Sequence, residues 1–363
     1  MNLALVVHDF DPALGQGRYC VELASRLAPA QAITIYANRF AVSPRPGWRF
    51  VKVPAWRRTA LSTVFSFLAA SERRVRRGHH DVVHAQGLTC WHADVITAHI
   101  CNAARSRVAP PIGPRASLFA ALVNPIEAAF YRESGARHLI AISRRVAADV
   151  RAEYGWRRPV SVVHHGVDTE HFRPVADAAE KRQARRHFGV PGDGWLWLFV
   201  GEAVKGLREA ILQLPAFPEA RLLAISRSAR EPYDALARER GVTSRFHFRG
   251  PEPRVDLAYR AADVFVYPSG YDTFGMVVSE AMATGLPVIV GRDIGAAELI
   301  DPGVSGFLVD PASADDLRGT LETLRQTPAL AETAGRAARR TAEGQTWDAC
   351  AEATQHVYRT LTR

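Results

Sequence analysis

The chain has 363 residues, of which 47% are hydrophobic and 23% charged, and its formal net charge is +9. This length and composition exclude a disordered or fibrous chain and suit a globular protein with two domains. No apolar run reaches the roughly 18 residues of a membrane span. The four cysteines are scattered without a CxxC pair, which argues against a disulfide framework and a zinc site. A reducing cytoplasm is therefore the expected compartment.

Short strands alternate with helices through the first half of the chain, a pattern typical of a parallel, doubly wound sheet. Ser143 is expected to cap a helix that Gly155 ends. Strands are expected at 3–8, 32–36, 81–84, 95–98, 138–142 and 160–163, and helices at 18–27, 124–134 and 143–153.

A polar segment from Asp168 to about Arg186 is expected to be a linker, after which the alternation resumes. We expect an N-terminal domain at 1–172, a C-terminal domain at 173–345 and a closing helix within 346–363. Two such α/β domains would face each other across a cleft at the carboxyl edges of their sheets. Strands are expected at 195–200, 221–225, 246–248, 263–267, 288–290 and 306–309, and helices at 207–213, 232–240, 314–325 and 347–361.

The most informative stretch lies between the strands at 263–267 and 288–290, where Asp272 and Glu280 flank the start of an apolar helix. A wholly helical segment between these two carboxylates would span about 12 Å. That is roughly the distance from a sugar ring to a ribose across a diphosphate. One carboxylate would then bind sugar hydroxyls and the other the ribose diol.

The same helix start is also a predicted phosphate site. A helix N-terminus offers free backbone N–H groups and the positive end of a dipole. A phosphate is therefore expected over the amides of Phe274, Gly275 and Met276, where glycine permits close approach.

Three further loops after strands leave two interpretations open. The Gly15–Gly17 loop lacks the third glycine and the acid of a dinucleotide fingerprint, so it is either an ordinary turn or a close approach to a phosphate or sugar. Lys205 and Arg249 are either solvated or neutralise a diphosphate.

His84 and His99 end two strands of the first half and are expected at the cleft edge of its sheet, either as packed structural residues or as site residues. No His, Asp and Glu cluster has metal-ligand spacing. We therefore expect a site without a metal or cofactor.

A basic and apolar stretch follows Arg57 and Arg58. The apolar run from Leu61 to Leu68 leads into four arginines between Arg73 and Arg77. This stretch is either a solvated helix face or an amphipathic element that contacts an anionic membrane or acceptor. The arginines are spread over the whole chain, so no nucleic-acid partner is expected.

Together these motifs resemble the family-4 retaining glycosyltransferases of the GT-B type, over nearly the whole chain. The run from Asp272 to Glu280 is similar to the E-x7-E signature of that family. Segments 141–143 and 162–174 look like its hinge-side signature, Val200-Gly201 with Lys205-Gly206 like its diphosphate turn, and the helix around Trp347 like the C-terminal helix that crosses back to the first domain.

The resemblance implies a role for each motif residue. Glu280 would hold the ribose, and Asp272 with the backbone of 274–276 would hold the donor sugar and phosphate. Lys205 would neutralise the leaving diphosphate, and His99 would lie beside the donor sugar. The expected catalytic residues are His99, Asp272 and Lys205; the expected donor-binding residues are Gly15, Gly17, Lys205, Arg249, Phe274, Gly275, Met276 and Glu280.

The chain departs from the family pattern at two positions. Asp272 replaces a glutamate, and Glu202 stands where the family usually has arginine, so Arg249 or Arg227 is expected to assist the diphosphate.

The resemblance implies metal-independent, retaining transfer of a hexose-like sugar from a UDP- or GDP-linked donor to a glycan or lipid-linked acceptor, of the lipopolysaccharide core or exopolysaccharide type. The basic and apolar stretch from Leu61 to Arg77 motivates the expectation that the protein acts in the cytoplasm at the inner membrane face. The alternatives are an enzyme that makes a small soluble glycoside or acts on the sugar nucleotide itself, and a non-catalytic sugar-nucleotide-binding protein.

Overall fold

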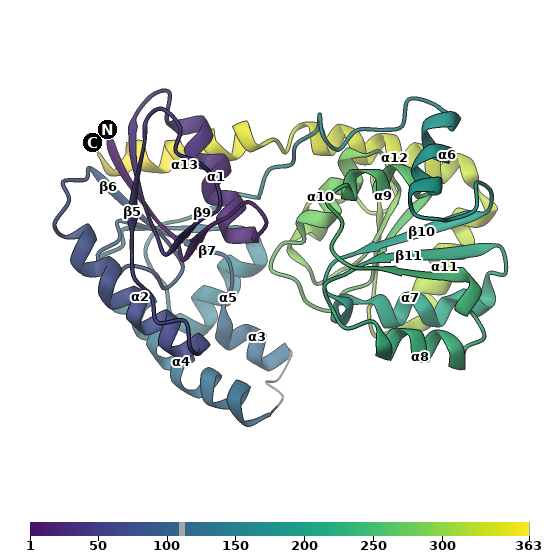
Figure 1. Ribbon diagram of the computed structural model, residues 1–363, viewed down its shortest axis with the longest axis horizontal. Helices are drawn as coiled ribbons and strands as arrows, with labels where there is room; N and C mark the ends of the chain where they lie inside the picture. The colour runs from purple at the N-terminus through teal and green to yellow at the C-terminus, as the bar shows by residue number, and fades with distance from the viewer. Residues whose placement is uncertain (109–112, 363) are drawn as a thin grey trace. The chain divides into compact units, whose positions relative to one another are not determined.

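The computed structural model describes residues 1–108 and 113–362, which form two compact units (Figure 1). Unit 1 comprises Met1–His165 and the C-terminal segment from Trp347, and unit 2 spans Gly166–Thr346. Residues 109–112 of the expected N-terminal domain and Arg363 of the expected closing segment lie outside the described residues. Both units are doubly wound α/β domains, which confirms the predicted fold class.

Unit 1 is built on a seven-stranded parallel sheet of order β5-β3-β1-β6-β7-β8-β9. Its central strands are apolar runs buried on both faces, as parallel sheets require. The strands are β1 (Asn2–Val6), β3 (Ala32–Ala37), β5 (Trp48–Lys52), β6 (Val82–Gln86), β7 (Val95–Ala98), β8 (His138–Ala141) and β9 (Val160–Val162), with a small separate pair β2 (Asp9–Phe10) and β4 (Arg39–Phe40).

Helices cover both faces of this sheet. Helices α1 and α13 pack together on one face, and α2 to α5 lie on the other (Figure 1). The Ser143 hydroxyl accepts the Val146 N–H at the start of α5, and Gly155 ends that helix in the left-handed region at φ 66°, as predicted. The helices are α1 (Gly15–Leu27), α2 (Ala60–Val75), α3 (Asn102–Val108), α4 (Pro114–Glu133), α5 (Arg144–Tyr154) and α13 (Trp347–Leu361).

The C-terminal helix α13 is anchored to unit 1 through a buried histidine. His84 Nδ1 lies 2.6 Å from the Tyr358 hydroxyl on α13, and its Nε2 lies 2.6 Å from Oγ1 of Thr97. Tyr19 of α1 packs edge-on against the same imidazole. Both ring nitrogens therefore have partners, which offsets the cost of burying a polar ring.

Unit 2 has a six-stranded parallel sheet of order β12-β11-β10-β13-β14-β15. Its strands are β10 (Trp195–Val200), β11 (Ala220–Ile225), β12 (Phe246–Arg249), β13 (Val264–Tyr267), β14 (Val288–Gly291) and β15 (Phe307–Val309). Its helices are α6 (Ala178–His187), α7 (Leu207–Gln213), α8 (Glu231–Glu239), α9 (Val255–Ala261), α10 (Met276–Ala283), α11 (Ala314–Gln326) and α12 (Pro328–Glu343), with 3-10 turns at 203–205, 214–216, 243–245 and 295–299.

The linker predicted for 168–186 is wrong in its second half, which forms α6. This helix is polar, and its main anchor is the buried side chain of Arg185. The guanidinium donates to Oδ2 of Asp263 at 2.6 Å and to the carbonyls of Ala261, Gly192 and Gly194. The pair of buried Arg185 with half-buried Asp263 thus adds to the small apolar contact of Ala184 and Phe188, and a hydrophobic pattern in the sequence does not reveal it.

His84 gives the first testable prediction, because burial lowers its pKa from 6.5 to about 3. The unfolded chain takes up a proton near pH 6.5 that the folded chain refuses. Stability is therefore full above pH 6.5 and is lost as pH falls towards 3, at up to about 1.4 kcal/mol per pH unit for this group.

We expect the His84→Gln variant to have a shallower loss of unfolding free energy between pH 6.5 and 4.5 than the unmodified protein, as measured by urea denaturation. His356→Gln, an exposed change on the same helix α13, is the control and should keep the original slope. Equal slopes for the His84 variant and the unmodified protein would contradict the prediction.

Candidate functional site

The order of strands in unit 2 reverses at β10, and this reversal creates the candidate site. From β10 the chain runs outward through β11 to β12, then returns to place β13 on the other side of β10. In open α/β sheets a reversal of this kind is where a ligand-binding crevice is expected. Lys205 follows β10 and Asp272 follows β13, which brings the two side chains together.

Lys205 and Asp272 form an ion pair at this crevice. Lys205 Nζ lies 3.0 Å from Oδ2 of Asp272, and the Tyr267 hydroxyl donates to the same oxygen at 2.8 Å. Burial, with the charge of Asp272, raises the pKa of Tyr267 well above its usual value, so this hydroxyl stays a donor. Both of these bonds reach Oδ2, so among the described residues Oδ1 has no hydrogen-bond donor and can accept one from a hydroxyl group.

The residues from Asp272 to Gly275 form a fixed loop before α10, so the 12 Å span of a wholly helical segment does not apply. The carbonyl of Asp272 accepts the Gly295 N–H at 3.0 Å, and the carbonyl of Phe274 accepts the Ala296 N–H at 2.6 Å. Gly275 then turns the chain at φ 97°, in the left-handed region that favours glycine. The first N–H groups of α10, from Met276, have no partner within the helix and can bind an anion.

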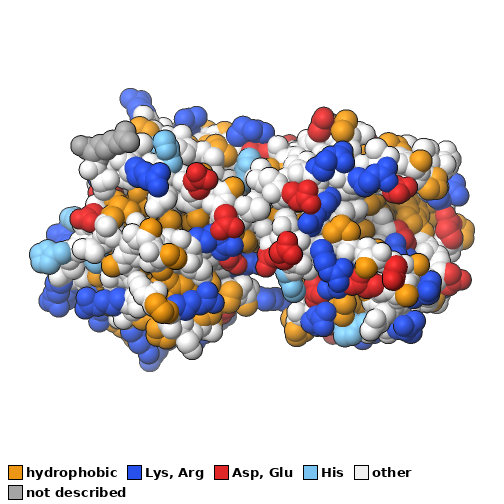
Figure 2. Space-filling model, turned by 90° about the horizontal axis from the view of Figure 1, so that it is seen from above, with side chains coloured by type: hydrophobic (Ala, Val, Ile, Leu, Met, Phe, Trp, Pro, Cys, Tyr) orange, Lys and Arg blue, Asp and Glu red, His pale blue; other side chains and the backbone are white. Residues whose placement is uncertain are grey.

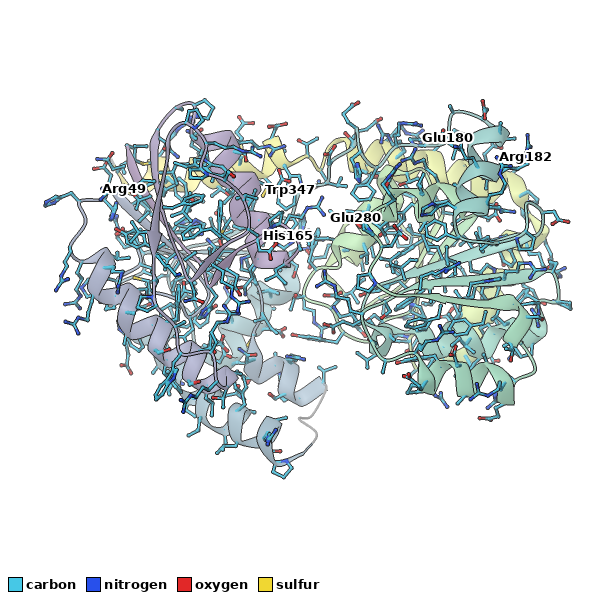
Figure 3. All side chains as sticks on the ribbon, viewed as in Figure 1. Arg49, His165, Glu180, Arg182, Glu280 and Trp347 are labelled. Atoms are coloured by element: carbon cyan, nitrogen blue, oxygen red, sulfur yellow. The ribbon has the colours of Figure 1, made fainter. Side chains whose placement is uncertain are left out.

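Glu280 lies on the second turn of α10 and is 7% exposed (Figure 3). The Tyr259 hydroxyl donates to its Oε2 at 2.8 Å, which fixes the direction of the carboxylate. A carboxylate fixed in this way accepts hydrogen bonds with little further loss of entropy, as the recognition of a diol requires.

The loop between β10 and α7 depends on two glycines that pack closely against β13 and the loop after it. A Cβ on Gly201 would lie 3.3 Å from the Tyr267 ring, and one on Gly206 would lie 2.9 Å from atoms of Pro268. The Ala203 N–H donates to the Ser228 hydroxyl at 3.0 Å. These contacts hold the backbone of the 203–205 turn and thus position Lys205.

Glu202 makes the local charge unfavourable for an anion. Its carboxylate is close enough to contribute to the raised pKa of Tyr267. Glu202 and Asp272 with Lys205 sum to a formal charge of −1, so Lys205 by itself does not make the crevice positive. A diphosphate bound here would depend on the N-terminus of α10 as well.

Arg249 does not join this group. Its Nη2 donates to the carbonyl of Phe188 at 2.8 Å, at the end of α6, and β12 is the edge strand on the far side of β11. Position at a strand end therefore did not determine where the long side chain points. Arg227, which follows β11, is exposed and lies one strand from β10.

In unit 1 the predicted glycines lie in a helix instead of a loop, because α1 begins at Gly15. A Cβ on Gly17 would lie 2.3 Å from the carbonyl oxygen of Asp11, so packing of α1 against the 9–11 segment requires this glycine. Gly17 thus has a structural role, and the binding of a phosphate or sugar by Gly15 and Gly17 stays a prediction.

His99 lies directly after β7 and its Nε2 is 2.8 Å from Oε1 of Gln86. Burial lowers its pKa to about 3, so it is neutral at physiological pH. The placement of His84 at the same edge was wrong: β6 continues to Gln86, and His84 lies inside the sheet beneath α13.

Two tyrosines were missed at the sequence level. Tyr267 ends an apolar strand and Tyr259 lies in a helix, so both have the signature of core residues. The hydroxyl of Tyr267 reaches Asp272, and that of Tyr259 reaches Glu280. In the sequence, only their positions could have indicated this role: Tyr267 lies five residues before Asp272, and Tyr259 lies in the helix that precedes α10.

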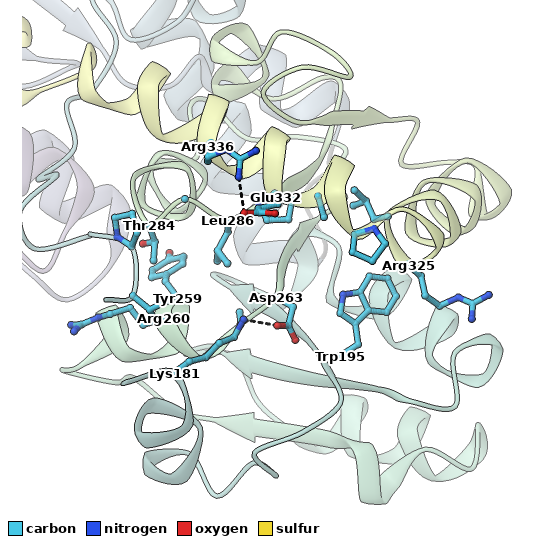
Figure 4. A pocket seen from close by; sticks show the side chains of 18 of the residues that line it. Lys181, Trp195, Tyr259, Arg260, Asp263, Thr284, Leu286, Arg325, Glu332 and Arg336 are labelled. Carbon is cyan, nitrogen blue, oxygen red and sulfur yellow. Dashed lines mark hydrogen bonds and ion pairs between the residues drawn. The ribbon is translucent and has the colours of Figure 1, made fainter. Parts of the chain in front are cut away.

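A cavity of about 610 Å³ lies at the opposite, amino edge of the unit 2 sheet (Figure 4). Its wall includes Trp195 at the start of β10 and Asp263 just before β13. Asp263 is fully engaged there, by Lys181 Nζ at 2.5 Å, by Arg185 and by the Leu196 N–H. These bonds hold α6 to the sheet, so the charged groups in the wall of this cavity have a structural role.

Neither a membrane-spanning helix nor a metal site occurs in the residues that the structure describes. None of the helices there is long and apolar enough to span a membrane, and no group of three metal-binding side chains occurs there. Basic and acidic side chains are interspersed on the face shown in Figure 2. All four cysteines are buried, and none of them forms a disulfide.

Comparison with known proteins identifies the family. Residues 14–171 match the model "Glycosyltransferase Family 4", and residues 180–341 match the model "Glycosyl transferases group 1". The D-inositol 3-phosphate glycosyltransferase of Streptomyces avermitilis is 30% identical over 95% of this chain and 82% of its own length. The protein of that name from Kribbella flavida is 35% identical, over 62% of this chain and 57% of its own length, so the match spans little more than half of that relative.

Among solved structures, sucrose-phosphate synthase from Thermosynechococcus elongatus superposes with a TM-score of 0.83 over 99% of both chains at 23% identity, which shows a shared fold. The two family models together account for most of the chain, and the Streptomyces relative matches nearly all of it. The chain therefore belongs to family 4 of the glycosyltransferases and has the GT-B fold.

Proposed function

We propose that this glycosyltransferase is retaining and metal-independent, and that it moves a hexose-like sugar from a UDP- or GDP-linked donor to a glycan or lipid-linked acceptor. One observation carries the proposal: the Lys205–Asp272 pair lies beside the N-terminus of α10 at the strand reversal of unit 2. Such a crevice combines a cation, free backbone amides and an accepting carboxylate. A sugar diphosphate needs these three groups.

The donor would be bound in three parts. The diphosphate lies over the amides of Gly275 and Met276 with Lys205 against it. Asp272 Oδ1 accepts hydroxyls of the donor sugar, and Glu280 accepts the ribose diol. As the sugar leaves, negative charge builds on the diphosphate, and these fixed donors stabilise it most at that point. His99, neutral and buried in unit 1, would act as a hydrogen-bonding partner of the donor sugar instead of an acid or base.

A lipid-linked acceptor, of the lipopolysaccharide core or exopolysaccharide type, places the protein at an anionic membrane surface in the cytoplasm. The exposed arginines at the end of α2 and just after it, Arg73 and Arg77, support this placement. The second candidate is a small soluble acceptor. The relatives named D-inositol 3-phosphate glycosyltransferase favour it, because their name specifies a phosphorylated polyol. The third candidate, a non-catalytic sugar-nucleotide-binding protein, is motivated by the charge of Glu202.

The ribose role of Glu280 can be tested by thermal shift and calorimetry with UDP, GDP and ADP sugars, followed by UDP against 2′-deoxy-UDP. Loss of a charged hydrogen bond in Glu280→Ala should weaken binding of the preferred nucleotide roughly 10- to 150-fold. The variant should also lose the preference for the ribose over the deoxyribose form.

Glu322→Ala, an exposed change on α11, is the control for that experiment. If Glu280→Ala binds both nucleotides as the unmodified protein does, Glu280 does not hold the ribose.

Lys205 should act mainly on the transition state. We expect Lys205→Met to lower kcat by about 10²–10³-fold with a smaller change in KM, because leaving-group charge develops during the reaction. Lys52→Met, exposed at the end of β5, serves as the control.

The anomeric configuration of the product, read by NMR, should match that of the donor; an inverted product would refute retention.

Glu202 should oppose the diphosphate. Glu202→Arg changes the local charge by two, which we expect to tighten UDP binding about tenfold, or ~1.4 kcal/mol, at low salt. The gain should shrink as ionic strength rises. Unchanged UDP affinity of the variant would mean that this side chain does not face the diphosphate. Measurable sugar transfer by the unmodified enzyme would exclude the alternative of a non-catalytic protein.

A further inference from the structure

Unit 1 has a strand reversal of its own, between β1 and β6, and a small polar cavity lies there. The chain runs from β1 to β3 and β5 on one side and returns to β6 on the other. A cavity of about 140 Å³ opens at these carboxyl ends, lined by His8 after β1, Gln86 at the end of β6 and His99 after β7. Strand reversals of this kind are where open α/β sheets bind ligands.

Two buried polar atoms at this cavity lack partners in the described part of the chain. Gln86 is 1% exposed, and while its Oε1 is bonded to His99, its Nε2 has no acceptor. His8 Nδ1 is likewise buried without a partner, and burial lowers the pKa of His8 to about 4. A buried amide with no acceptor is costly, so a ligand oxygen is the expected partner of Gln86.

The opposite wall is held in place by a buried carboxylate. Glu127 of α4 accepts the backbone N–H and the side-chain amide of Asn102, each at 3.1 Å, and the hydroxyl of Tyr154. Glu127 thus acts as a positioning residue for Asn102, which starts α3. Glu127 also lines the cavity, and its carboxylate is engaged by these bonds. The other polar lining groups include the amides of Gln86 and Asn102 and the imidazoles of His8 and His99, which recognise hydroxyl groups.

A second, larger groove of about 890 Å³ shares the lining residues Asn102 and Phe119 with this cavity, so the two lie next to each other. Its apolar floor includes Leu61 and Leu118. Arg58, Arg105 and Arg115 line it, and no Asp or Glu is among its described lining residues. Asn124 Oδ1, on the same wall, is buried without a partner in the described residues.

Exposed apolar side chains gather around the same groove. Trp56, Val108, Leu118 and Leu122 are 61%, 49%, 55% and 43% exposed, and all four lie in or beside the segments that line it. Arg58 stacks over the Trp56 ring at 5.2 Å. Exposed Trp and Leu side chains with unpaired arginines are typical of a surface that meets lipid headgroups.

We propose that the cavity and groove form an acceptor site for an anionic amphiphile presented by a bilayer. Its hydroxyl-bearing head enters the cavity at Gln86, its phosphate lies against Arg105 and Arg115, and its apolar chain lies over Leu61 and Leu118. Charge complementarity and the apolar floor select this occupant over a neutral glycan. The inference rests on the proposed glycosyl transfer and names the class of its acceptor.

Vesicle binding tests the groove. With 30% phosphatidylglycerol in phosphatidylcholine, the unmodified protein should co-sediment, and with pure phosphatidylcholine it should not. Arg105→Gln/Arg115→Gln should weaken binding roughly 25-fold, at about fivefold per arginine. Leu118→Asn/Leu122→Asn should also weaken it, and the exposed Arg359→Gln change on α13 should not.

Two outcomes would overturn the assignment of this groove. One is vesicle binding that Arg73→Gln/Arg77→Gln abolishes while both groove variants retain it. The other is full competition by millimolar glycerol 3-phosphate, which would mean that the site takes a soluble phosphate and needs no apolar chain.

Transfer tests the cavity. The sugar nucleotide with the largest thermal shift is supplied with a radiolabelled sugar and a membrane lipid extract, and label is counted in the butanol and water phases. Gln86→Leu should lower incorporation into the butanol phase about tenfold while vesicle binding and nucleotide binding persist. Label that enters only the water phase would refute a lipid acceptor.

Nucleotide binding is measured on every variant, because it separates the two proposals. If no sugar nucleotide binds to the unmodified protein, the proposed donor chemistry fails, whatever the vesicles show. If nucleotide binding is intact but the groove variants bind vesicles normally, only the acceptor assignment fails.

Discussion

The reversal of strand order in each parallel sheet is the constraint on which both candidate sites depend. A parallel sheet is buried on both faces, so polar groups can gather only at its edges and ends. Where successive strands lead away in opposite directions, the connecting segments diverge and leave backbone and side chains open at the carboxyl ends. In unit 2 this occurs between β10 and β13, and in unit 1 between β1 and β6. The chemistry at each position then follows from the few residues placed directly after those strands.

At the unit 2 reversal, burying the carboxylate of Asp272 costs free energy that hydrogen bonds from a ligand can offset. Asp272 is 8% exposed and takes both Lys205 and the Tyr267 hydroxyl on one oxygen. Burial of a charge pair is favourable only when hydrogen bonds complete it, and here one oxygen of the carboxylate is left for a ligand. Glu202 adds a second negative charge, and Lys205 is already paired with Asp272. An anionic donor would therefore bind through geometry, with fixed amides at Gly275 and Met276, more than through net charge.

The sequence predicts those parts of the structure whose signals are local. Apolar runs predict the strands, and Ser143 and Gly155 predict both ends of α5. Longer-range features escape: α6 is anchored by the pair of buried Arg185 with half-buried Asp263, and α12 buries mainly alanines, whose weak hydropathy gives a faint period. Site residues follow the same division. Asp272 and Glu280 were predicted from their positions, whereas Tyr259 and Tyr267 pass for core aromatics and the direction of the Arg249 side chain depends on α6.

The two reversals differ in electrostatic character, and this difference has a physical reason. The unit 2 crevice holds an ion pair next to a helix N-terminus, which suits a ligand whose charge grows during reaction. The unit 1 cavity holds imidazoles whose pKa values burial lowers to about 4 at His8 and about 3 at His99, together with the amide of Gln86. Neutral groups of this kind can donate to and accept from hydroxyls without stabilising a bound anion. Three cations, Arg58, Arg105 and Arg115, lie instead along the adjoining groove. A phosphate is thereby directed away from the cavity, and a hydroxyl is the group that the cavity can accept.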